Sequence, residues 1–448
     1  MGKLFGTDGI RGAADTYPLT PDMVEIIGRT IADHLLQHQK PAAVVVGRDT
    51  RISGPNIEKA LVEGIRSMGI DVLLAGILPT PGVAFLTRAL KAGAGIVISA
   101  SHNPYYDNGI KLFNGDGFKF PDETESAIEA QILSDPVPVL SSDRIAQVHP
   151  IEDASAQYTD FLKRVLDNTE VFKGLRIVID CSNGATHRIA PVLFSDLGAD
   201  VETIFDSPDG KNINENCGSQ HTDTLSRKVL ENRADVGLAF DGDGDRLIAV
   251  DETGGEITGD RMLAISARIL KDSGALKNNR VVSTVMSNMG LGEALRKMGI
   301  EHIMTQVGDR YVMEEMKRSG AILGGEDSGH MIFLNHHTTG DGIVTALNLL
   351  KAMCVTATPL SHLAEAMTVY PQVLHNVDVS SKPDLDSVPE IMDAIRRAED
   401  RLKERGRVLV RYSGTQPQCR VMVEGASQEE ITGICHGIAD IISNTIGN

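Results

Sequence analysis

The sequence contains no long apolar run, and no stretch approaches the roughly 18 consecutive apolar residues that a membrane-spanning helix needs. Its first residues carry no apolar signal region, and Gly6 stands where a myristoylation signal needs Ser or Thr. The five cysteines form no C-x-x-C pair and are odd in number, which disfavours a disulfide framework or a structural zinc site. These absences predict a protein of the reducing cytoplasm that does not bind membranes.

Basic charge is also scarce, with 43 Lys and Arg residues against 61 Asp and Glu residues. The net charge of −18 argues against bulk electrostatic attraction to nucleic acid or to anionic membranes. Any phosphate group must therefore be bound locally. Neither Gly-x-Gly-x-x-Gly nor the phosphate-loop pattern Gly-x-x-x-x-Gly-Lys-[Ser/Thr] occurs, which weighs against a nucleotide ligand.

The chain of 448 residues is too long for one ordinary core, and its 42% apolar residues indicate a globular protein of several domains. Short β-branched runs alternate with amphipathic stretches, which is typical of parallel or mixed sheets covered by helices. After Pro371 the pattern changes to that of a small α+β domain. We therefore predict an α/β protein with three similar α/β domains and a C-terminal α+β domain, over 1–152, 153–254, 255–370 and 371–448.

The first helix is predicted to begin with Thr20 as its N-cap and Pro21 at its first position. Further helices are predicted near Gln157, over 385–403 and from Gln428. Strands are predicted over 42–46, 71–75, 94–98, 176–180, 236–240, 247–251, 281–286, 301–305, 321–323, 376–379, 408–412 and 420–424.

A serine, an imidazole and an amide follow one of these strands in the segment Ser101-His102-Asn103-Pro104. The same residue types form ordinary turns, so the segment alone favours a turn and a functional loop about equally. A serine hydrolase is disfavoured, because Gly-x-Ser-x-Gly is absent around Ser101 and the adjacent His102 is poorly placed to act as its base.

Three alternating carboxylates, Asp241, Asp243 and Asp245, follow another strand with only glycines between them. An EF-hand is excluded, because Arg246 stands where its tight turn needs Gly and strands flank the loop. A structural turn rarely crowds three like charges, whereas three hard oxygen ligands suit Mg²⁺. A cation can activate a serine, and phosphoryl transfer most needs such a cation, so the two loops indicate a phosphoryl-transfer enzyme.

Three other segments carry polar groups that suit a phosphosugar. The segment 411–415, followed by Arg420, has two guanidinium groups and two hydroxyls for a phosphate, although solvated hairpin arginines explain it better when it is taken alone. In 324–330 the residues Glu326, Ser328 and His330 alternate, so they can face one side, with His330 as a proton shuttle. The segment 5–12 has three glycines and one cation, so its backbone can approach a ligand closely.

These segments together resemble one family, the α-D-phosphohexomutases, in order and spacing along the entire chain. The resemblance rests on Phe5–Gly12, Ser99–Pro104 with Asn108–Lys111, Asp241–Arg246, Gly324–His330 and Arg411–Pro417. Val307-Gly308-Asp309-Arg310 and the glycine of Ser413-Gly414-Thr415 resemble the branch that acts on glucosamine phosphates. Gln416 and Asp327 depart from the family's usual Glu and this branch's usual Gln, which bears on substrate affinity and selectivity more than on reaction class.

The resemblance implies an isomerase with four domains around a central cleft. It would interconvert glucosamine 6-phosphate and glucosamine 1-phosphate through a phosphoserine and glucosamine 1,6-bisphosphate, supplying UDP-N-acetylglucosamine and cell-wall synthesis. One Mg²⁺ per chain would be held by Ser101, Asp241, Asp243 and Asp245. The implied catalytic residues are Ser101, Arg11, Lys111 and His330, and the implied substrate-binding residues are Arg246, Glu326, Ser328, Arg411, Ser413, Gly414, Thr415 and Arg420.

Two other functions remain open: the same chemistry on glucose or mannose phosphates, and a catalytically silent phosphosugar sensor. A rim of three carboxylates, Glu326, Asp327 and Asp309, is expected to favour the cationic amino sugar. The sequence leaves open the oligomeric state, with a homodimer as one option, and the route by which Ser101 is first phosphorylated.

Overall fold

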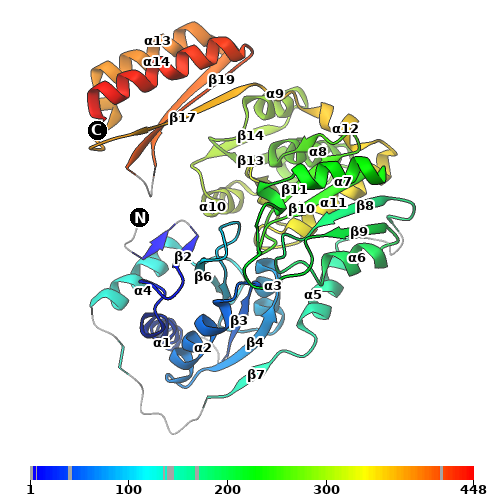
Figure 1. The fold of residues 1–448 in the computed structure, drawn as a ribbon, viewed down its shortest axis with the longest axis vertical. Coiled ribbons are helices and arrows are strands. Elements are labelled where there is room, and N and C mark those ends of the chain that lie inside the picture. The colour runs from blue at the N-terminus through cyan, green and yellow to red at the C-terminus, as the bar shows by residue number, and fades with distance from the viewer. Residues whose placement is uncertain are drawn as a thin grey trace. The chain divides into compact units, whose positions relative to one another are not determined.

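The computed structural model describes residues 4–6, 8–38, 43–134, 137–138, 146–166, 171–413 and 417–447 of the chain. The chain divides into two compact units (Figure 1). The first consists of Met1–Met286 and Gly299–Ala366, and the second of Ser287–Met298 and Met367–Asn448.

The first sheet of the first unit has seven strands: β1 (Phe5–Gly6), β2 (Gly9–Ala13), β3 (Ala43–Arg48), β4 (Asp71–Ile77), β5 (Ala94–Ile98), β6 (Asp107–Asn114) and β7 (Val148–Pro150). Their order is β1-β2-β6-β5-β3-β4-β7, with β5, β3, β4 and β7 parallel and the other pairings antiparallel. The accompanying helices are α1 (Pro21–Gln37), α2 (Gly54–Arg66), α3 (Thr80–Ala89) and α4 (Asp122–Ser134).

The helix α1 begins at Pro21 as predicted, because proline fixes the backbone angle that the first helical turn requires. Thr20 precedes it in an extended conformation, but among the described residues its side chain makes no capping hydrogen bond. Helices α1 and α2 pack backbone against backbone, since a Cβ on Gly28 would lie 2.4 Å from the carbonyl oxygen of Leu61. These helices bury one face of the first sheet's apolar core.

The second sheet has five strands: β8 (Arg176–Asp180), β9 (Asp200–Ile204), β10 (Val236–Phe240), β11 (Leu247–Asp251) and β12 (Glu256–Ile257). Their order is β12-β11-β10-β8-β9, with β10, β8 and β9 parallel. The helical elements of this part are α5 (Ala154–Lys163), α6 (Ala190–Asp196), η1 (Gly218–Gln220) and α7 (Asp223–Asn232).

The third sheet has four strands: β13 (Arg280–Thr284), β14 (Glu301–Thr305), β15 (Leu323–Gly325) and β16 (Met331–Phe333). Their order is β14-β13-β15-β16, and only the β15–β16 pairing is antiparallel. The helical elements are α8 (Gly259–Asp272), η2 (Lys277–Asn279), α10 (Asp309–Ser319), α11 (Gly342–Thr356), α12 (Leu360–Leu363) and η3 (Ala364–Ala366). Polar loops therefore follow β5, β10 and β15, where ligands bind in sheets of this kind.

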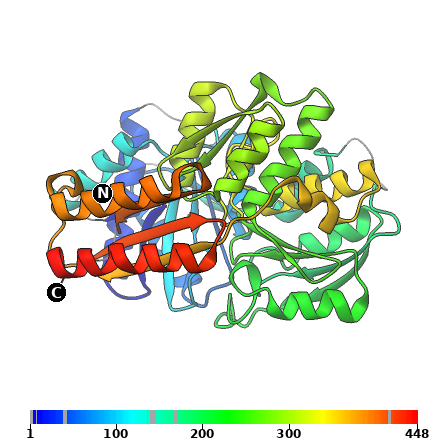
Figure 2. The same ribbon diagram turned by 90° about the horizontal axis from the view of Figure 1, so that it is seen from above.

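The second unit contains an antiparallel sheet of β17 (Gln372–Asp378), β18 (Gly406–Tyr412) and β19 (Gln418–Gly425), in the order β17-β19-β18. Its helical elements are α9 (Met289–Lys297), η4 (Leu385–Ser387), α13 (Pro389–Leu402), η5 (Lys403–Arg405) and α14 (Gln428–Ile446). Helices α13 and α14 lie side by side and cover one face of the sheet (Figures 1 and 2). The predicted C-terminal α+β arrangement is confirmed.

The helix α9 lies in sequence between two strands of the third sheet, yet it belongs to the second unit. The amide of Met289 donates to Glu424 over 3.3 Å, and the side chain of Asn288 donates to the carbonyl of Tyr370 over 2.9 Å. The predicted domain boundaries near 152, 254 and 370 remain predictions.

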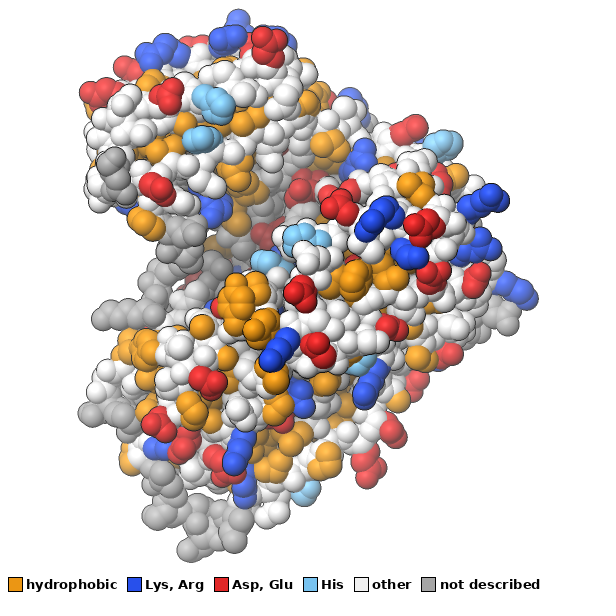
Figure 3. Space-filling view, viewed as in Figure 1, with side chains coloured by type: hydrophobic (Ala, Val, Ile, Leu, Met, Phe, Trp, Pro, Cys, Tyr) orange, Lys and Arg blue, Asp and Glu red, His pale blue; other side chains and the backbone are white. Residues whose placement is uncertain are grey.

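Among the described residues, no single helix combines the length and apolar composition of a membrane span. Only α11 together with Leu360–Ala366, a pair bent by 97°, satisfies both criteria jointly. On the face of the molecule drawn in Figure 3, acidic and basic side chains are dispersed among one another. The net negative charge therefore does not form one continuous patch on that face.

Candidate active site

Two loops that are far apart in sequence meet at Ser101, which follows β5. The Ser101 hydroxyl donates a hydrogen bond of 2.5 Å to Asp241, which follows β10. Both side chains are buried. His102 Nδ1 lies 3.4 Å from the same hydroxyl, and burial lowers the pKa of His102 to about 4. The structure therefore places the predicted nucleophile beside the predicted metal loop, with the carboxylate of Asp241 as the closer partner.

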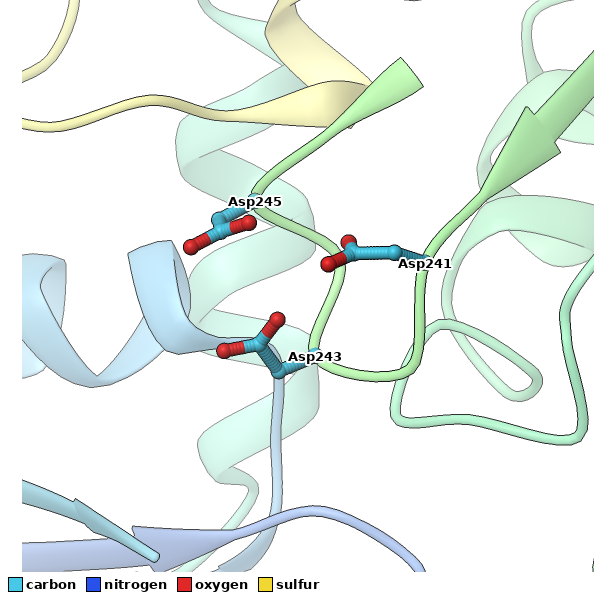
Figure 4. A group of neighbouring side chains, drawn as sticks. All are labelled: Asp241, Asp243 and Asp245. Atoms are coloured by element: carbon cyan, nitrogen blue, oxygen red, sulfur yellow. The ribbon is translucent and has the colours of Figure 1, made fainter. Parts of the chain in front are cut away.

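Asp241, Asp243 and Asp245 turn their carboxylates toward one another in the loop between β10 and β11 (Figure 4). All three are buried, and their potential ligand atoms lie within 4.8 Å of one another. Among the described residues, Asp243 Oδ1 and Asp245 Oδ1 are buried without a hydrogen-bond partner. Burial and the charges of Asp245 and Asp243 raise the pKa of Asp241 well above its usual range. Two buried hard oxygens without hydrogen-bond partners, and the repulsion felt by Asp241, fit a small divalent cation such as Mg²⁺.

Glycines allow the two loops to approach each other. A Cβ on Gly242 would lie 2.7 Å from the carbonyl oxygen of Ser101, closer than van der Waals contact permits. Gly244 has a φ of 71°, a left-handed conformation that glycine adopts without strain. The spacing of the acidic residues therefore depends on both intervening glycines.

Lys111, which lies on β6, is a buried cation within this acidic group. Its Nζ lies 2.7 Å from Asp243, 3.1 Å from Asp245 and 3.1 Å from Asp8. Burial lowers the pKa of Lys111, but the three carboxylates outweigh burial, and the net pKa is well above the ordinary value. Lys111 is therefore protonated at neutral pH and can donate a proton or a hydrogen bond.

Two arginines lie close to the same loops. Arg11 pairs with Asp8 over 2.5 Å and donates to the carbonyl oxygen of Ala100 over 3.4 Å, next to Ser101. Arg246 Nε lies 3.8 Å from Asp245 Oδ1. Both cations adjoin the acidic loop, where their charge can offset that of a phosphoryl group.

His330 lies between two carboxylates. Its Nδ1 is 3.6 Å from Asp245, and its Nε2 is 3.3 Å from Asp309. Burial lowers the pKa of His330, while Asp245 and Asp309 raise it, with a net increase. The predicted proton shuttle is thus adjacent to the metal loop.

The loop 324–330 offers both a carboxylate and a hydroxyl. Glu326 accepts a hydrogen bond of 3.1 Å from the amide of Gly308, which joins this loop to the segment 307–310. Ser328 Oγ is buried and has no hydrogen-bond partner among the described residues. A buried hydroxyl without a partner is suited to binding a polar ligand group.

The three carboxylates of the expected rim have different partners in the structure. Asp327 accepts a hydrogen bond of 3.2 Å from the amide of Asp260 in the first turn of α8. Asp309 forms an ion pair with Lys119, which also pairs with Asp8. The rim of three carboxylates therefore stays a prediction, in which Glu326 is the candidate for binding the amino group.

Several residues at the site were missed by sequence reasoning. Lys119 pairs with both Asp8 and Asp309, although no strand end or motif marks it. Asp49 and Arg51 follow β3, so the rule that polar residues gather at strand ends could have identified them. Both side chains are fully buried, and they form an ion pair beneath the Ser101 loop.

In the second unit, the register of β18 and β19 places Arg411 directly opposite Arg420. Burial and the charge of Arg420 both lower the pKa of Arg411. Arg420 Nε is buried without a hydrogen-bond partner among the described residues. Like charges paired across strands are unfavourable, so an anion would stabilise this pair. Ser413 follows β18. The predicted phosphate ligands Gly414 and Thr415 lie outside the described residues, as does Gln416, which departs from the family's usual Glu.

Four family models match successive parts of the chain. They describe the phosphoglucomutase/phosphomannomutase alpha/beta/alpha domains I, II and III, over residues 2–136, 156–255 and 258–370, and the C-terminal domain over residues 374–441. The chain belongs to the phosphoglucomutase/phosphomannomutase family. Membership of this phosphohexomutase family confirms both the resemblance and the predicted fold class.

Relatives within the family extend over the full length of the chain. The phosphoglucosamine mutases of Syntrophus aciditrophicus and Syntrophobacter fumaroxidans are 54% and 53% identical to it, and each alignment covers 100% of both chains. A phosphoglucomutase/phosphomannomutase family protein of Burkholderia thailandensis has a solved structure with a TM-score of 0.83 and 26% identity, covering 100% of this chain and 99% of that one.

A more distant family structure shares the fold. Aspergillus fumigatus N-acetylphosphoglucosamine mutase, solved in complex with GlcNAc-6P and magnesium, has a TM-score of 0.71 at 18% identity. The match covers 99% of this chain and 96% of that chain.

Proposed function

We propose that the chain interconverts glucosamine 6-phosphate and glucosamine 1-phosphate, with Ser101 as the phosphoryl carrier. The observation that carries this proposal is the hydrogen bond of 2.5 Å between the Ser101 hydroxyl and Asp241, inside a buried group of carboxylates. The amino sugar is favoured over glucose or mannose because the full-length relatives at 53–54% identity are phosphoglucosamine mutases.

One Mg²⁺ would be held by Asp241, Asp243 and Asp245 together with an oxygen of the group on Ser101. When bound, it would supply positive charge that stabilises the transferring phosphoryl group. Lys111 contacts two of these carboxylates, so its ammonium lies where it can donate to a reacting oxygen. Arg11 adjoins the Ser101 loop and would bind the phosphoryl oxygens from another side.

The reaction is a relay. Phosphorylated Ser101 transfers its phosphoryl group to the free hydroxyl of the hexosamine monophosphate, which forms glucosamine 1,6-bisphosphate and regenerates the serine hydroxyl. The bisphosphate turns over, and its other phosphoryl group returns to Ser101. Lys111 and His330 are the acid and base candidates, because both lie beside Asp245 at the site of transfer.

The sugar and its second phosphate need separate binding groups. Glu326 and Ser328 would bind sugar hydroxyls or the amino group, and Arg246 would add charge near the reacting phosphate. Arg411, Ser413, Gly414, Thr415 and Arg420 would bind the phosphate that is not reacting. This function fits a cytoplasmic enzyme, active alone or as a homodimer, whose product supplies UDP-N-acetylglucosamine.

The proposal is tested with the purified full-length chain, glucosamine 6-phosphate and Mg²⁺. Glucosamine 1-phosphate should form, as followed by phosphorus NMR, and peptide mass spectrometry should find the phosphate of active enzyme on Ser101. Faster turnover of glucose or mannose 6-phosphate would instead indicate a hexose phosphomutase. Binding of all three sugars without turnover would indicate a sensor.

A further inference from the structure

The backbone of Ser101 is in a conformation that serine rarely adopts. Its φ is 53°, in the left-handed region, where the backbone of residues other than glycine is strained. Such a residue persists only where its surroundings fix it. The groups that hold this peptide therefore bear on the direction in which the hydroxyl points.

One set of these groups comes from the loop after β3. Arg51 Nη2 donates to the carbonyl oxygen of Ser101 over 3.1 Å and to that of Asn103 over 2.5 Å. Asp49 pairs with Arg51 and accepts a hydrogen bond of 2.6 Å from Ser99 Oγ. Ser99 Oγ in turn accepts a hydrogen bond of 2.9 Å from the amide of Ser101. The first sheet thus holds the loop from one side.

The same two carbonyl oxygens are also bound by a residue of the part built on the second sheet. Asn214, between β9 and η1, donates from Nδ2 to Ser101 over 2.9 Å and to Asn103 over 3.0 Å. Its own amide donates to the carbonyl of Ser182 over 2.9 Å. Asn214 has a φ of 59°, which asparagine tolerates better than most residues.

Asn214 also packs against the metal loop. A Cβ on Gly242 would lie 2.8 Å from Asn214 Nδ2 and 2.7 Å from the carbonyl oxygen of Ser101. The amide group, the acidic loop and the peptide of the nucleophile are therefore in mutual contact. Asn214 follows β9 and Asp241 follows β10, so the residue that holds the Ser101 peptide and the partner of its hydroxyl both come from loops of the second sheet.

We propose that Asn214 is a positioning residue, which fixes the Ser101 peptide in register with Asp241 by binding the carbonyl oxygens of Ser101 and Asn103. This inference rests on the proposed function, in which Ser101 carries the phosphoryl group. The side-chain amide of Asn214 is occupied by the carbonyl oxygens of Ser101 and Asn103. Loss of that amide should therefore lower kcat and leave KM nearly unchanged.

The chain offers a matched control for this test. Asn216 is also a left-handed asparagine, with a φ of 53°, but it is exposed. Asn214→Gly and Asn216→Gly each remove an amide and keep a residue that accepts positive φ. Asn214→Asp keeps the shape but presents a carboxylate to two carbonyl oxygens, so it should be the more harmful variant.

We expect Asn214→Gly to lower kcat about tenfold, as loss of two hydrogen bonds allows, with KM changed less than about twofold. Asn214→Asp should lower kcat further, and Asn216→Gly should match the wild type. Hydrogen exchange in the peptide 99–104 should be faster in Asn214→Gly than in Asn216→Gly, while the thermal midpoints of these two variants stay alike.

Unchanged kcat in Asn214→Gly, or a change in KM alone, overturns the inference. Unchanged hydrogen exchange in the peptide 99–104 also overturns it, and this readout does not depend on the substrate. Failure of the wild type to turn over glucosamine 6-phosphate would instead contradict the proposed function. The two failures are therefore distinguishable.

Discussion

Ser101 and Ser182 provide an internal comparison, because both are buried serines with positive φ in a loop that follows a strand. Ser101 donates to Asp241, whereas Ser182 Oγ donates to the neighbouring carbonyl of Cys181. Ser101→Ala should abolish mutase activity and prevent phosphorylation, while Ser182→Ala should retain both. Kinetics and intact-mass measurement of each variant test this, and phosphorylated, active Ser101→Ala would refute the carrier role.

The buried His337 is expected to make the stability of the folded chain depend on pH. Its Nε2 lies 2.9 Å from the carbonyl oxygen of Pro81, and its Nδ1 accepts a hydrogen bond of 2.7 Å from the amide of Thr338. Only the neutral ring, protonated at Nε2, satisfies both contacts. Burial lowers the pKa of His337 from 6.5 to about 4.

The sign of this effect follows from proton binding. Between pH 6.5 and about 4 the unfolded chain binds the proton at His337 and the folded chain does not, so this contribution to stability is present above pH 6.5 and is lost as the pH falls. From pH 7 to pH 5 the loss is about 2 kcal/mol. In urea unfolding, the free energy of unfolding of His337→Gln should fall less between pH 7 and pH 5 than that of the wild type, by that amount. His221→Gln, at an exposed site, should behave as the wild type. Equal slopes in all three proteins would contradict the assignment.

Individual residues were predictable where a motif marked them. Lys111 and His330 lie in segments that resemble the family, and the structure places both beside Asp245. Asn214 could not be selected in this way, because Asn212 and Asn216 surround it in the same loop and only the folded chain distinguishes them. Its contacts are more than 100 residues away in sequence, with separations of 113 and 111.

At the level of elements, α3 begins beside the acidic loop that contains Asp241, Asp243 and Asp245. The amide of Thr80 donates to the Asp243 carbonyl over 2.8 Å, and its hydroxyl donates to Asp243 Oδ2 over 2.6 Å. Lys111 binds the same Oδ2, so Oδ1 is left to face a cation. The first residue of the helix thereby orients Asp243, a candidate Mg²⁺ ligand in the loop that follows β10.

Thr80→Val should raise the Kd for Mg²⁺ about tenfold, because groups that orient a metal ligand commonly contribute this much. Thr80→Ser should restore the affinity. Thr87→Val is the matched control, since the Thr87 hydroxyl donates within the same helix to the carbonyl of Val83 over 2.8 Å. Calorimetric titration with Mg²⁺ measures each affinity, and equal affinities in Thr80→Val and Thr87→Val would remove the orienting role.

Strand ends were the most predictable elements, because a run of apolar residues followed by a polar loop is visible in sequence. The third sheet departs from the prediction: β15 is Leu323–Gly325, two residues later than expected. Its glycines resemble a loop, yet a Cβ on Gly324 would lie 2.9 Å from the carbonyl of Val282. Close packing explains these glycines, and periodicity cannot reveal it. Periodicity is equally uninformative for α9, because its sequence pattern does not indicate which sheet the helix contacts.

On the scale of the whole molecule, the proposed function assigns the phosphate that is not reacting to Arg411 and Arg420 of the second unit. Arg411→Ala and Arg420→Ala should each raise KM and reduce kcat/KM about tenfold or more, as expected for loss of a charged hydrogen bond. Stability should not fall, because each change removes a cross-strand repulsion. Arg396→Ala, on the exposed face of α13, serves as the control. Wild-type kcat/KM in both variants would show that this pair does not bind the phosphate.

Substrate choice depends on where negative charge remains once the chain is folded. Glu326 and Asp327 are adjacent, but Asp327 accepts from the first turn of α8, a role that an asparagine side chain can also fill. Glu326 is largely buried beside His330 and Arg246, and one of its oxygens is bound by the Gly308 amide. Its second oxygen can bind the ammonium group of glucosamine.

We therefore expect kcat/KM to be higher for glucosamine 1-phosphate than for glucose 1-phosphate, with activity on both. Glu326→Gln should reduce this preference about tenfold, since a charged hydrogen bond becomes a neutral one, and Asp327→Asn should leave it unchanged. Competition assays with both sugars measure the ratio directly. If Asp327→Asn reduced the preference and Glu326→Gln did not, the recognition of the amino group would belong to the exposed carboxylate of Asp327, and the role given to Glu326 would be wrong.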